Sequence, residues 1–255
     1  MAPPARAFLA VTGPAAFLAL VTIALAGCGS SGSPGAATLA TTSAPASSAA
    51  ASATTPAATV AANGKPSQAP PAGYQWVGNS ADKAWLAVPD SWIALNPNAM
   101  SVQRAISRVK LKGLSASDLR TGLESIKKNH GIMVVDTASV ATSPEKFLTN
   151  VNMFCAQAPI EPGPGAATAI STSIKTAYSK AGGKVLAVKT ITDTGSSLIL
   201  SVEVNLQTAA GQTSHDLQYL QVTSTGRLCY TTFSTDRPGK FFPLFEKIAR
   251  TISIG

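Results

Sequence analysis

The sequence predicts an α+β domain built on an antiparallel sheet. Four runs of strand-forming residues follow one another near the C-terminus, at 184–192, 197–207, 215–224 and 227–235. Short turns with Gly or polar residues join them, and such turns connect antiparallel neighbours, whereas parallel strands need long crossovers. Helical periodicity precedes and follows these runs. Successive strands with helices before and after them are typical of the α+β class.

The first half of the domain is expected to hold a hairpin followed by two helices. Aromatic-rich runs within 74–95, joined by an Asn-Ser-Ala-Asp turn, predict the hairpin. A helix capped by Ser101 is expected to reach Lys110. The next helix begins at a capping box at 115–118 and ends before Gly131, and its buried stripe consists of Leu119, Leu123 and Ile126.

The second half is expected to contain six strands and two helices. Strands are predicted at 131–140 and 147–157, and Gly163-Pro164-Gly165 precedes a helix with the buried positions Ile170, Ile174 and Tyr178. Among the four strands that follow, 197–207 alternates most regularly between apolar and polar residues, which predicts one buried face. A closing helix has Pro243 in its first turn and an apolar face made of Leu244, Phe245, Ile248 and Ile252.

The N-terminus has the features of a secretory signal. One positive charge, Arg6, precedes an apolar run at 15–26, and small residues lie directly before the cysteine of Leu25-Ala26-Gly27-Cys28. An uncleaved membrane anchor is the alternative, but a spanning helix needs about 20 apolar residues. The stretch resembles the bacterial lipoprotein signal class, in which the cysteine receives a diacylglycerol and becomes the first residue after cleavage. The resemblance implies that residues 1–27 are removed and that Cys28 anchors the chain at the extracytoplasmic face of the cell membrane.

Residues 28–72 are expected to form a disordered linker. They are almost entirely Ala, Ser, Thr, Pro and Gly, with Lys65 as the only charge. Such a segment cannot bury enough apolar surface to offset its conformational entropy. As a flexible coil of this length it would have a root-mean-square span of roughly 35–40 Å. The folded domain is therefore predicted to occupy residues 73–255, held clear of the lipid headgroups.

Basic residues are concentrated in one part of this domain. The domain contains all but two of the 20 Lys and Arg residues and all 12 Asp and Glu residues. Seven of the bases lie between 101 and 130: Arg104, Arg108, Lys110, Lys112, Arg120, Lys127 and Lys128. They indicate either a face for anionic lipid headgroups or cell-wall polymers, or simply the solvated surface of helices. The overall excess is moderate, and no nucleic-acid partner is expected.

Two cysteines remain once Cys28 is assigned to the lipid. Outside the cytoplasm, Cys155 and Cys229 are expected to form a disulfide. The bond would constrain the unfolded chain, which in the chain-entropy model contributes roughly 4 kcal/mol to stability. Two buried free thiols are the alternative. Metal ligation is not expected, because neither His130 nor His215 has ligand spacing from a cysteine.

Motifs for catalysis or cofactor binding are lacking in the sequence. It has no Gly-x-Ser-x-Gly elbow and no phosphate-binding glycine motif, and its acidic residues are scattered singly. His215 and Asp216 are adjacent, but neighbouring residues of a strand point to opposite faces. Three tryptophans are concentrated near the first hairpin, where they either fill a core or, if exposed, provide a binding surface: Trp76, Trp85 and Trp92.

Several short segments resemble the PsbP-like family. They are Val-Pro-Asp-Ser-Trp at 88–92, Thr-Asn-Val-Asn at 149–152, the four-strand meander, and Phe-x-x-Ile-x-x-Thr-Ile at 245–252. That family includes photosystem II accessory subunits, a Ran-binding import factor and many bacterial lipoproteins. The resemblance implies an α/β/α sandwich around an antiparallel sheet, and it transfers no catalytic residue. Because members of the family bind different partners, fold alone does not give the function.

Two classes of function follow. In the first, the domain is a non-catalytic binding or accessory module without a cofactor, held at the membrane by the lipid on Cys28, and its partner is an envelope protein, a polymer or a small apolar ligand. In the second, it is an envelope hydrolase whose site is not visible as a linear motif, because catalytic groups meet in space and not along the chain.

Overall fold

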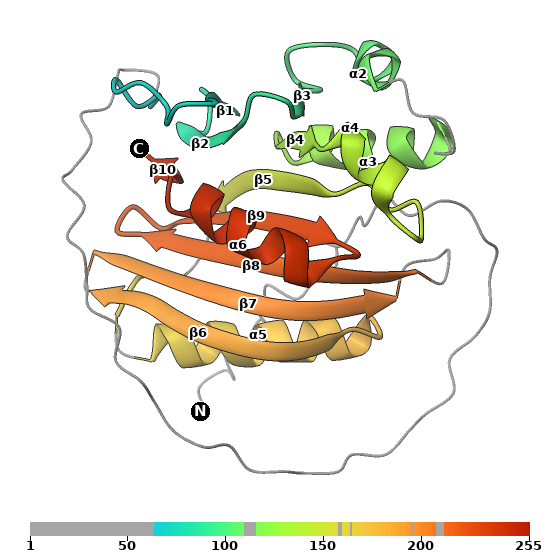
Figure 1. Ribbon diagram of the computed structural model, residues 1–255. Coiled ribbons are helices and arrows are strands. Elements are labelled where there is room, and N and C mark those ends of the chain that lie inside the picture. Colours follow the sequence, from blue (N-terminus) through green and yellow to red (C-terminus); the bar gives the residue numbers. More distant parts are fainter. Residues whose placement is uncertain (1–63, 110–115, 158–159, 164, 195, 208–211) are drawn as a thin grey trace, which may run out of the picture.

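A computed structural model describes residues 64–255, except for 110–115, 158–159, 164, 195 and 208–211. The expected signal peptide at 1–27, Cys28 and most of the expected linker lie outside these residues. Within them the chain folds as an α+β domain with antiparallel sheets, as the sequence predicts (Figure 1). Among these residues, no helix has the length and apolar character needed to cross a bilayer.

The elements follow the predicted order closely. The strands are β1 (Tyr74–Asn79), β2 (Ala84–Pro89), β3 (Ile93–Leu95), β4 (Ile132–Val135), β5 (Asn150–Gln157), β6 (Lys184–Thr194), β7 (Ser197–Gln207), β8 (Thr213–Thr223), β9 (Arg227–Thr235) and β10 (Ser253–Ile254). The helices are α2 (Val102–Arg108), α3 (Ala116–Lys128), α4 (Thr137–Thr142), α5 (Ala166–Lys180) and α6 (Pro238–Ala249).

Two antiparallel sheets organise these elements. The large sheet has the strand order β3-β4-β5-β9-β8-β7-β6, and the small one has the order β1-β2-β10. The hairpin β1–β2 and the meander β6–β9 are confirmed by their strand pairing. The order of strands in the large sheet departs from their order in the chain at one point. There β5, which comes before α5 in the chain, pairs with β9 in the middle of the sheet. Strands from both halves of the domain therefore meet along this seam.

The large sheet is covered on both faces, because apolar residues in its central strands point both ways. One face of β7 and β8 packs under α5, with Leu200, Val202 and Leu220 against Ile174. On the opposite face, Leu217 and Phe233 pack against α6 and the small sheet. Figure 1 shows α6 in front of the sheet and α5 behind it. Helix, sheet and helix thus form three layers.

Helices α2 and α3 build a third apolar cluster at the β3–β4 end of the sheet. Leu119 and Leu123 of α3 pack with Met133 and Val135 of β4, as the predicted buried stripe requires. Met133 is opposite Asn152 of β5, and directly opposite residues share a face. When the pairing is followed from β5 through β9 to β8, the face of the sheet that holds Met133 is the same face that α5 covers. Helices α2 and α3 therefore lie on the same side of the sheet as α5.

One strand prediction and one helix prediction need correction. The expected strand at 131–140 ends at Val135, because the Asp136 side chain accepts a hydrogen bond from the Ala138 N–H and caps the short helix α4. The closing helix begins at Pro238, five residues before Pro243, which lies inside it. Pro238 suits the first turn, where the missing N–H has no helical partner.

The chain before β1 also packs more closely than the expected linker boundary at 72 implies. Gly64 is buried against Lys83, and an added Cβ at Gly64 would lie 2.4 Å from the Lys83 Cβ. The Trp76 indole N–H donates to the Gln68 carbonyl at 3.0 Å. Residues 64–72 therefore line the first hairpin.

Candidate functional site

The two cysteines expected to pair lie on adjacent strands. Cys155 of β5 is directly opposite Cys229 of β9, with 4.0 Å between the Cα atoms and 2.01 Å between the sulfurs. The geometric requirement for a disulfide, Cα atoms within about 7 Å, is therefore met. The bond joins the two strands of the seam between the halves of the domain.

The three tryptophans do not form one surface. Trp92 is buried and contacts Phe245 of α6 edge-to-face, with 6.5 Å between the ring centroids. Trp76 and Trp85 are half-buried, and their register places both on the outer face of the small sheet. The Trp85 ring covers Gly78, and the Lys65 ammonium lies 5.7 Å from its centroid. One indole thus belongs to the core, and only the other two remain candidates for a binding surface.

His215 and Asp216 face opposite sides of β8. The His215 Nδ1 lies 2.8 Å from the Asn205 side-chain oxygen on the face covered by α6. Asp216 is fully buried on the α5 face, where the Ser214 hydroxyl donates to its carboxylate at 2.6 Å. The two side chains therefore do not act as a catalytic pair. His130 is exposed at the end of α3, far along the chain from either group.

Asp216 belongs to a band of buried polar side chains that crosses the α5 face. Adjacent register positions on β5, β9 and β8 supply its members, and each is at most 5% exposed. We call these residues the inner polar band: Asn150, Asn152, Ser214, Asp216, Gln218, Thr232 and Ser234. The Tyr178 side chain of α5 reaches the band near Asp216 and Gln218. The band separates the apolar cluster under α5 from the one under α2 and α3.

Several polar atoms of this band have no hydrogen-bond partner among the described residues. They are the Asn152 Oδ1, the Gln218 Oε1 and the Tyr178 hydroxyl, and the last two belong to side chains that lie against each other. The amide nitrogens of the same side chains are bonded: Asn152 donates to the Asn150 Oδ1 at 3.2 Å, and Gln218 donates to the Thr232 hydroxyl at 3.2 Å. Buried polar atoms without partners are rare in native proteins and mark strain, function or an unseen partner.

Burial dominates the electrostatics of the band. It raises the pKa of Asp216 to about 6, although hydrogen bonds from Ser214 and Ser234 oppose the rise. Burial and the nearby Asp216 charge also raise the pKa of the Tyr178 hydroxyl. The band therefore presents a carboxyl group beside unpaired acceptors, in surroundings that favour an added hydrogen-bond donor.

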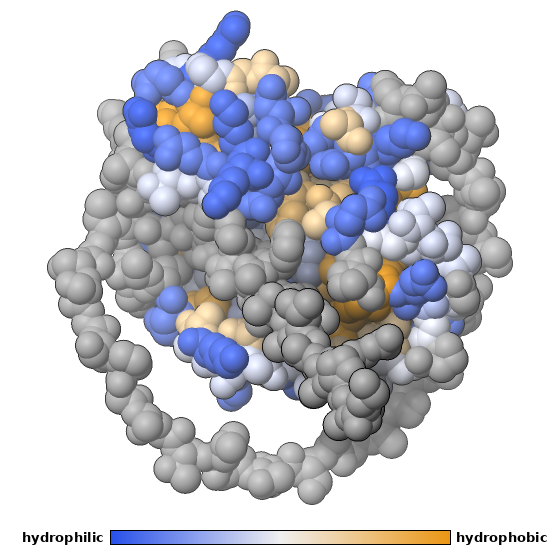
Figure 2. All heavy atoms as spheres, turned by 180° about the vertical axis from the view of Figure 1, so that it is seen from behind, coloured by the Kyte–Doolittle hydropathy of each residue, from blue (hydrophilic) through white to orange (hydrophobic). Residues whose placement is uncertain are grey.

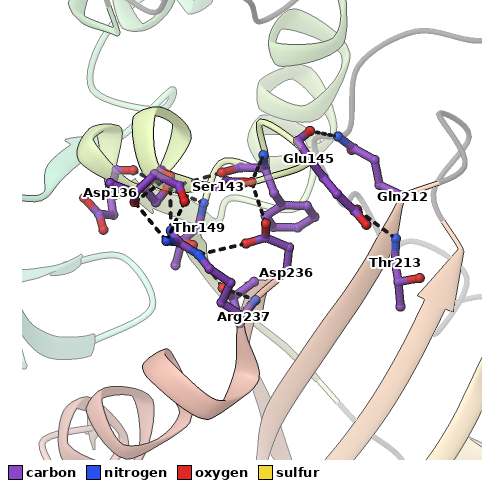
Figure 3. A network of polar contacts seen from close by, with 12 residues as sticks. Asp136, Ser143, Glu145, Thr149, Gln212, Thr213, Asp236 and Arg237 are labelled. Carbon is purple, nitrogen blue, oxygen red and sulfur yellow. Dashed lines mark hydrogen bonds and ion pairs between the residues drawn. The ribbon is translucent and has the colours of Figure 1, made fainter.

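A second polar cluster holds α4 against the start of α6 (Figure 3). The Arg237 guanidinium donates to the carbonyls of Ser139 and Thr142, and so caps the last turn of α4. The Ser143 hydroxyl donates to the Asp236 carboxylate at 2.5 Å and accepts from the Phe147 N–H at 2.7 Å. These bonds fix the loop after α4, where Ser143 has a carboxylate partner and no imidazole.

Exposed bases lie side by side on α2 and α3. Arg104 and Arg108 are one turn apart on α2, and the Arg120 guanidinium reaches from α3 to the Gln103 side chain of α2 at 2.7 Å. Figure 2 shows hydrophilic side chains crowded over this part of the molecule, at the upper left. We call these exposed residues the basic face: Arg104, Arg108, Arg120, Lys127 and Lys128. Lys110 and Lys112, also noted in the sequence, lie outside the described residues.

Sequence reasoning found the disulfide pair but not the inner polar band. The available signal was the row Ser214, Asp216 and Gln218, polar residues at alternate positions of a strand that continues with apolar Leu220. Recognising the band also requires knowing that β5 pairs with β9. In the described part of the chain, no group of three or more His, Cys, Asp or Glu residues is placed to hold a metal ion.

No family model matches the chain, and no curated protein matches it. Among solved structures it is similar to the Ran-binding protein Mog1p of Saccharomyces cerevisiae, at 9% sequence identity. The match covers 71% of this chain and 95% of the Mog1p chain, with a TM-score of 0.43. A likeness at this level identifies no shared ligand or activity.

Proposed function

We propose that this chain is a lipid-anchored cell-envelope lipoprotein whose extracytoplasmic domain, of the PsbP-like α/β/α type, is a non-catalytic binding module. The cysteines support this location. Two of the three are joined in the folded domain, and the third, Cys28, follows the apolar signal directly. Disulfides persist in compartments outside the cytoplasm, which is where a lipoprotein signal would deliver the domain.

The inner polar band supports the binding role. The observation that carries it is the set of unpaired atoms on Asn152, Gln218 and Tyr178 around one end of the band. Leaving a buried polar atom without a partner costs about 1–3 kcal/mol, and this cost applies most clearly to the Asn152 Oδ1, because the Tyr178 and Gln218 side chains lie against each other. A ligand that supplies hydrogen bonds there would recover this free energy.

The chemistry of the band defines the ligand class. Two of the unpaired atoms are amide oxygens, which only accept hydrogen bonds, and the neighbouring Asp216 carboxylate accepts as well. The ligand is therefore a small molecule with several hydroxyl or amine donors. The sequence alone left three kinds of partner open: an envelope protein, a polymer or a small apolar ligand. Because the band is nearly inaccessible, binding requires an opening between α5 and the sheet, and the bound molecule should stabilise the domain.

Native mass spectrometry of the full chain, released from its own membrane in mild detergent, tests the binding role. We expect a bound small molecule as an additional mass that survives purification and disappears on unfolding. The variant Asn152→Leu/Gln218→Met replaces both unpaired amides by apolar side chains of similar volume. It should fold and should lose the additional mass.

A matched variant controls for the substitution itself. Gln221→Met changes a glutamine of the same strand on the opposite face, away from the band. It should keep the bound molecule. Equal occupancy in the band variant and the control, or a wild-type protein that never carries a ligand, contradicts the binding role of the band.

One observation favours the hydrolase alternative. A buried carboxyl group with a pKa of about 6 is suited to acid–base chemistry near neutral pH. Its hydrogen-bond partners are Ser214 of the same strand and Ser234 of β9, and His215 points to the other face. If Asp216→Asn abolished the hydrolysis of a defined ester or glycan while the fold was kept, the enzyme alternative would replace the binding module.

A further inference from the structure

The basic face is a continuous surface. The exposed bases of α3 form a stripe, because Arg120, Lys127 and Lys128 are separated by about two helical turns. Arg120 meets Gln103 across the helix pair, while Ala105 and Leu123 are buried beneath. Glu124 is the exposed acid among the side chains described on these two helices. The face therefore has a net positive charge.

The same face lies next to the point where the tether enters the domain. Gly64, the first described residue, packs against Lys83 in the β1–β2 turn. Asn79, just before that turn, donates its side-chain amide to the carbonyl of His130. His130 follows the end of α3, where Lys127 and Lys128 are exposed. Through these contacts, the first described residues are connected by the β1–β2 turn to the end of α3 that carries Lys127 and Lys128.

Other exposed lysines are placed differently. Lys175 and Lys180 of α5 and Lys184 of β6 lie at the opposite edge of the large sheet from β3 and β4. Figure 1 shows α2 and the first described residues in the upper part of the molecule and α5 at the bottom. Exposed bases also lie on α6, where the Lys247 ammonium is 4.8 Å from the Tyr74 ring centroid. The basic face differs from them because its five bases lie on two adjacent helices in contact with each other.

We propose that the basic face docks on the anionic phospholipid headgroups of the membrane that carries the lipid anchor, and so sets the orientation of the domain. This inference rests on the proposed function, since it assumes the anchor on Cys28. The tether fixes the domain close to its own membrane, where even weak contacts are populated because the effective concentration is high.

Phosphate groups fit this surface chemically. Arginine binds phosphate oxygens through paired N–H donors, and lysine adds a mobile point charge. Each base close to an anionic membrane strengthens binding by roughly fivefold, and the effect is lost beyond a Debye length of about 8 Å. Only a face in contact with the headgroups benefits, so the docked domain should have one preferred orientation.

Lysine footprinting of the full, lipidated chain tests the proposal. The protein is reconstituted in phosphatidylcholine vesicles with or without phosphatidylglycerol, and the acetylation rate of each lysine is measured by mass spectrometry. We expect acetylation of Lys127 and Lys128 to slow several-fold when phosphatidylglycerol is present. Acetylation of Lys175 and Lys180 should be unchanged, and high salt should abolish the difference.

Two matched triple variants separate the basic face from overall charge. Arg104→Gln/Arg108→Gln/Arg120→Gln should remove most of the protection of Lys127 and Lys128. Lys175→Gln/Lys180→Gln/Lys184→Gln lowers the net charge by the same amount at the other edge and should leave the protection intact. Thermal unfolding verifies that both variants are folded. If the arginine variant does not fold, the wild-type comparison between the two vesicle types still decides the question.

The outcomes are distinct. A protein that associates with neither vesicle type lacks the anchor, which contradicts the proposed function and with it this inference. A lipidated protein with equal footprints on both vesicle types overturns the docking alone. Protection of Lys127 and Lys128 by a soluble polyanion but not by phosphatidylglycerol vesicles also overturns it, since the face would then serve an acidic polymer.

Discussion

Asp216 is a buried carboxyl group whose stabilising partners, Ser214 and Ser234, are neutral hydroxyls. Hydrogen bonds from Ser214 and Ser234 compensate part of its lost hydration, yet its pKa is still raised to about 6. Buried charges normally have a charged partner. The ionised carboxylate at this position therefore lowers the stability of the folded domain at neutral pH.

Replacing Asp216 by Asn should stabilise the domain at neutral pH. The folded-state pKa of about 6 lies above the ordinary value of 3.8, so the protonated carboxyl favours folding below pH 3.8, and this contribution is lost as the pH rises through 6. The loss is at most about 3 kcal/mol. Urea unfolding at pH 4 and pH 7 should show a free-energy advantage for Asp216→Asn that grows with pH.

The control for this prediction is Asp193→Asn, a change at an exposed carboxyl group on edge strand β6. It should alter the unfolding free energy little at either pH. If Asp216→Asn gives the same difference from wild type at pH 4 and pH 7, the raised pKa of Asp216 is wrong.

Gly78 is needed because the Trp85 ring covers it. An added Cβ would lie 2.4 Å from the ring and 2.4 Å from the Ala84 carbonyl oxygen. Gly78→Ala should therefore destabilise the domain by about 1–3 kcal/mol in a thermal or urea unfolding experiment. Gly239→Ala, where an added Cβ has no neighbour within 4 Å, should be neutral or stabilising. Equal effects of the two changes would contradict the packing of Trp85.

At the scale of secondary-structure elements, the disulfide links two strands that are far apart in the chain. It ties β5, which precedes α5, to β9, the last strand of the meander, across a separation of 74 residues. In the chain-entropy model such a bond contributes about 4 kcal/mol. Cys155→Ala/Cys229→Ala should lower the unfolding free energy by a comparable amount, as measured with urea. Reductant should destabilise the wild type but not the variant, and a wild type insensitive to full reduction would contradict this account.

Local pattern predicted most elements, because each depends on residues close in the chain. The alternation in 197–207 corresponds to β7, and the spacing of Ile170, Ile174 and Tyr178 corresponds to the buried face of α5. Helix α4 was missed because its residues, Thr-Ala-Ser-Val, suit a strand equally well, and only the cap at Asp136 indicates a helix. The start of the last helix was predicted too late. Both Pro238 and Pro243 are acceptable in the first turn of a helix, and the sequence does not show which of them lies there.

The inner polar band was not predictable from local pattern. Its members come from three strands, and the pairing of β5 with β9 depends on how the two halves of the domain assemble. In β8 polar residues occur on both faces, so the alternation of Ser214, Asp216 and Gln218 does not show which face is buried. Tertiary packing determines which face of β8 is buried, and it buries these three side chains.

At the scale of the whole molecule, the proposed function makes the segment before Gly64 a tether that limits what the domain can reach. The sequence before Gly64 has the composition of a flexible linker, whereas residues 64–72 line the first hairpin. Deleting most of 29–63 should therefore leave the unfolding transition of the domain unchanged. It should reduce contact with partners away from the membrane, because a shorter tether restricts the accessible volume.

Chemical cross-linking in intact cells measures this effect. The shortened chain should lose cross-links to other envelope components while retaining its fold and its membrane association. A shuffled linker of equal length and composition is the control, and it should behave like the wild type. Loss of folding in the shortened chain would show instead that part of 29–63 belongs to the domain.

The central claim is that Cys28 carries the lipid that holds a binding domain at the membrane. Replacing Cys28 by Ala should release the domain into the soluble fraction or leave an unprocessed precursor. The most direct measurement is intact-mass analysis of the wild-type chain from the membrane fraction. We expect the loss of residues 1–27 together with a gain of acyl mass on Cys28. A mature chain without acyl mass, or one that still begins at Met1, would contradict the account.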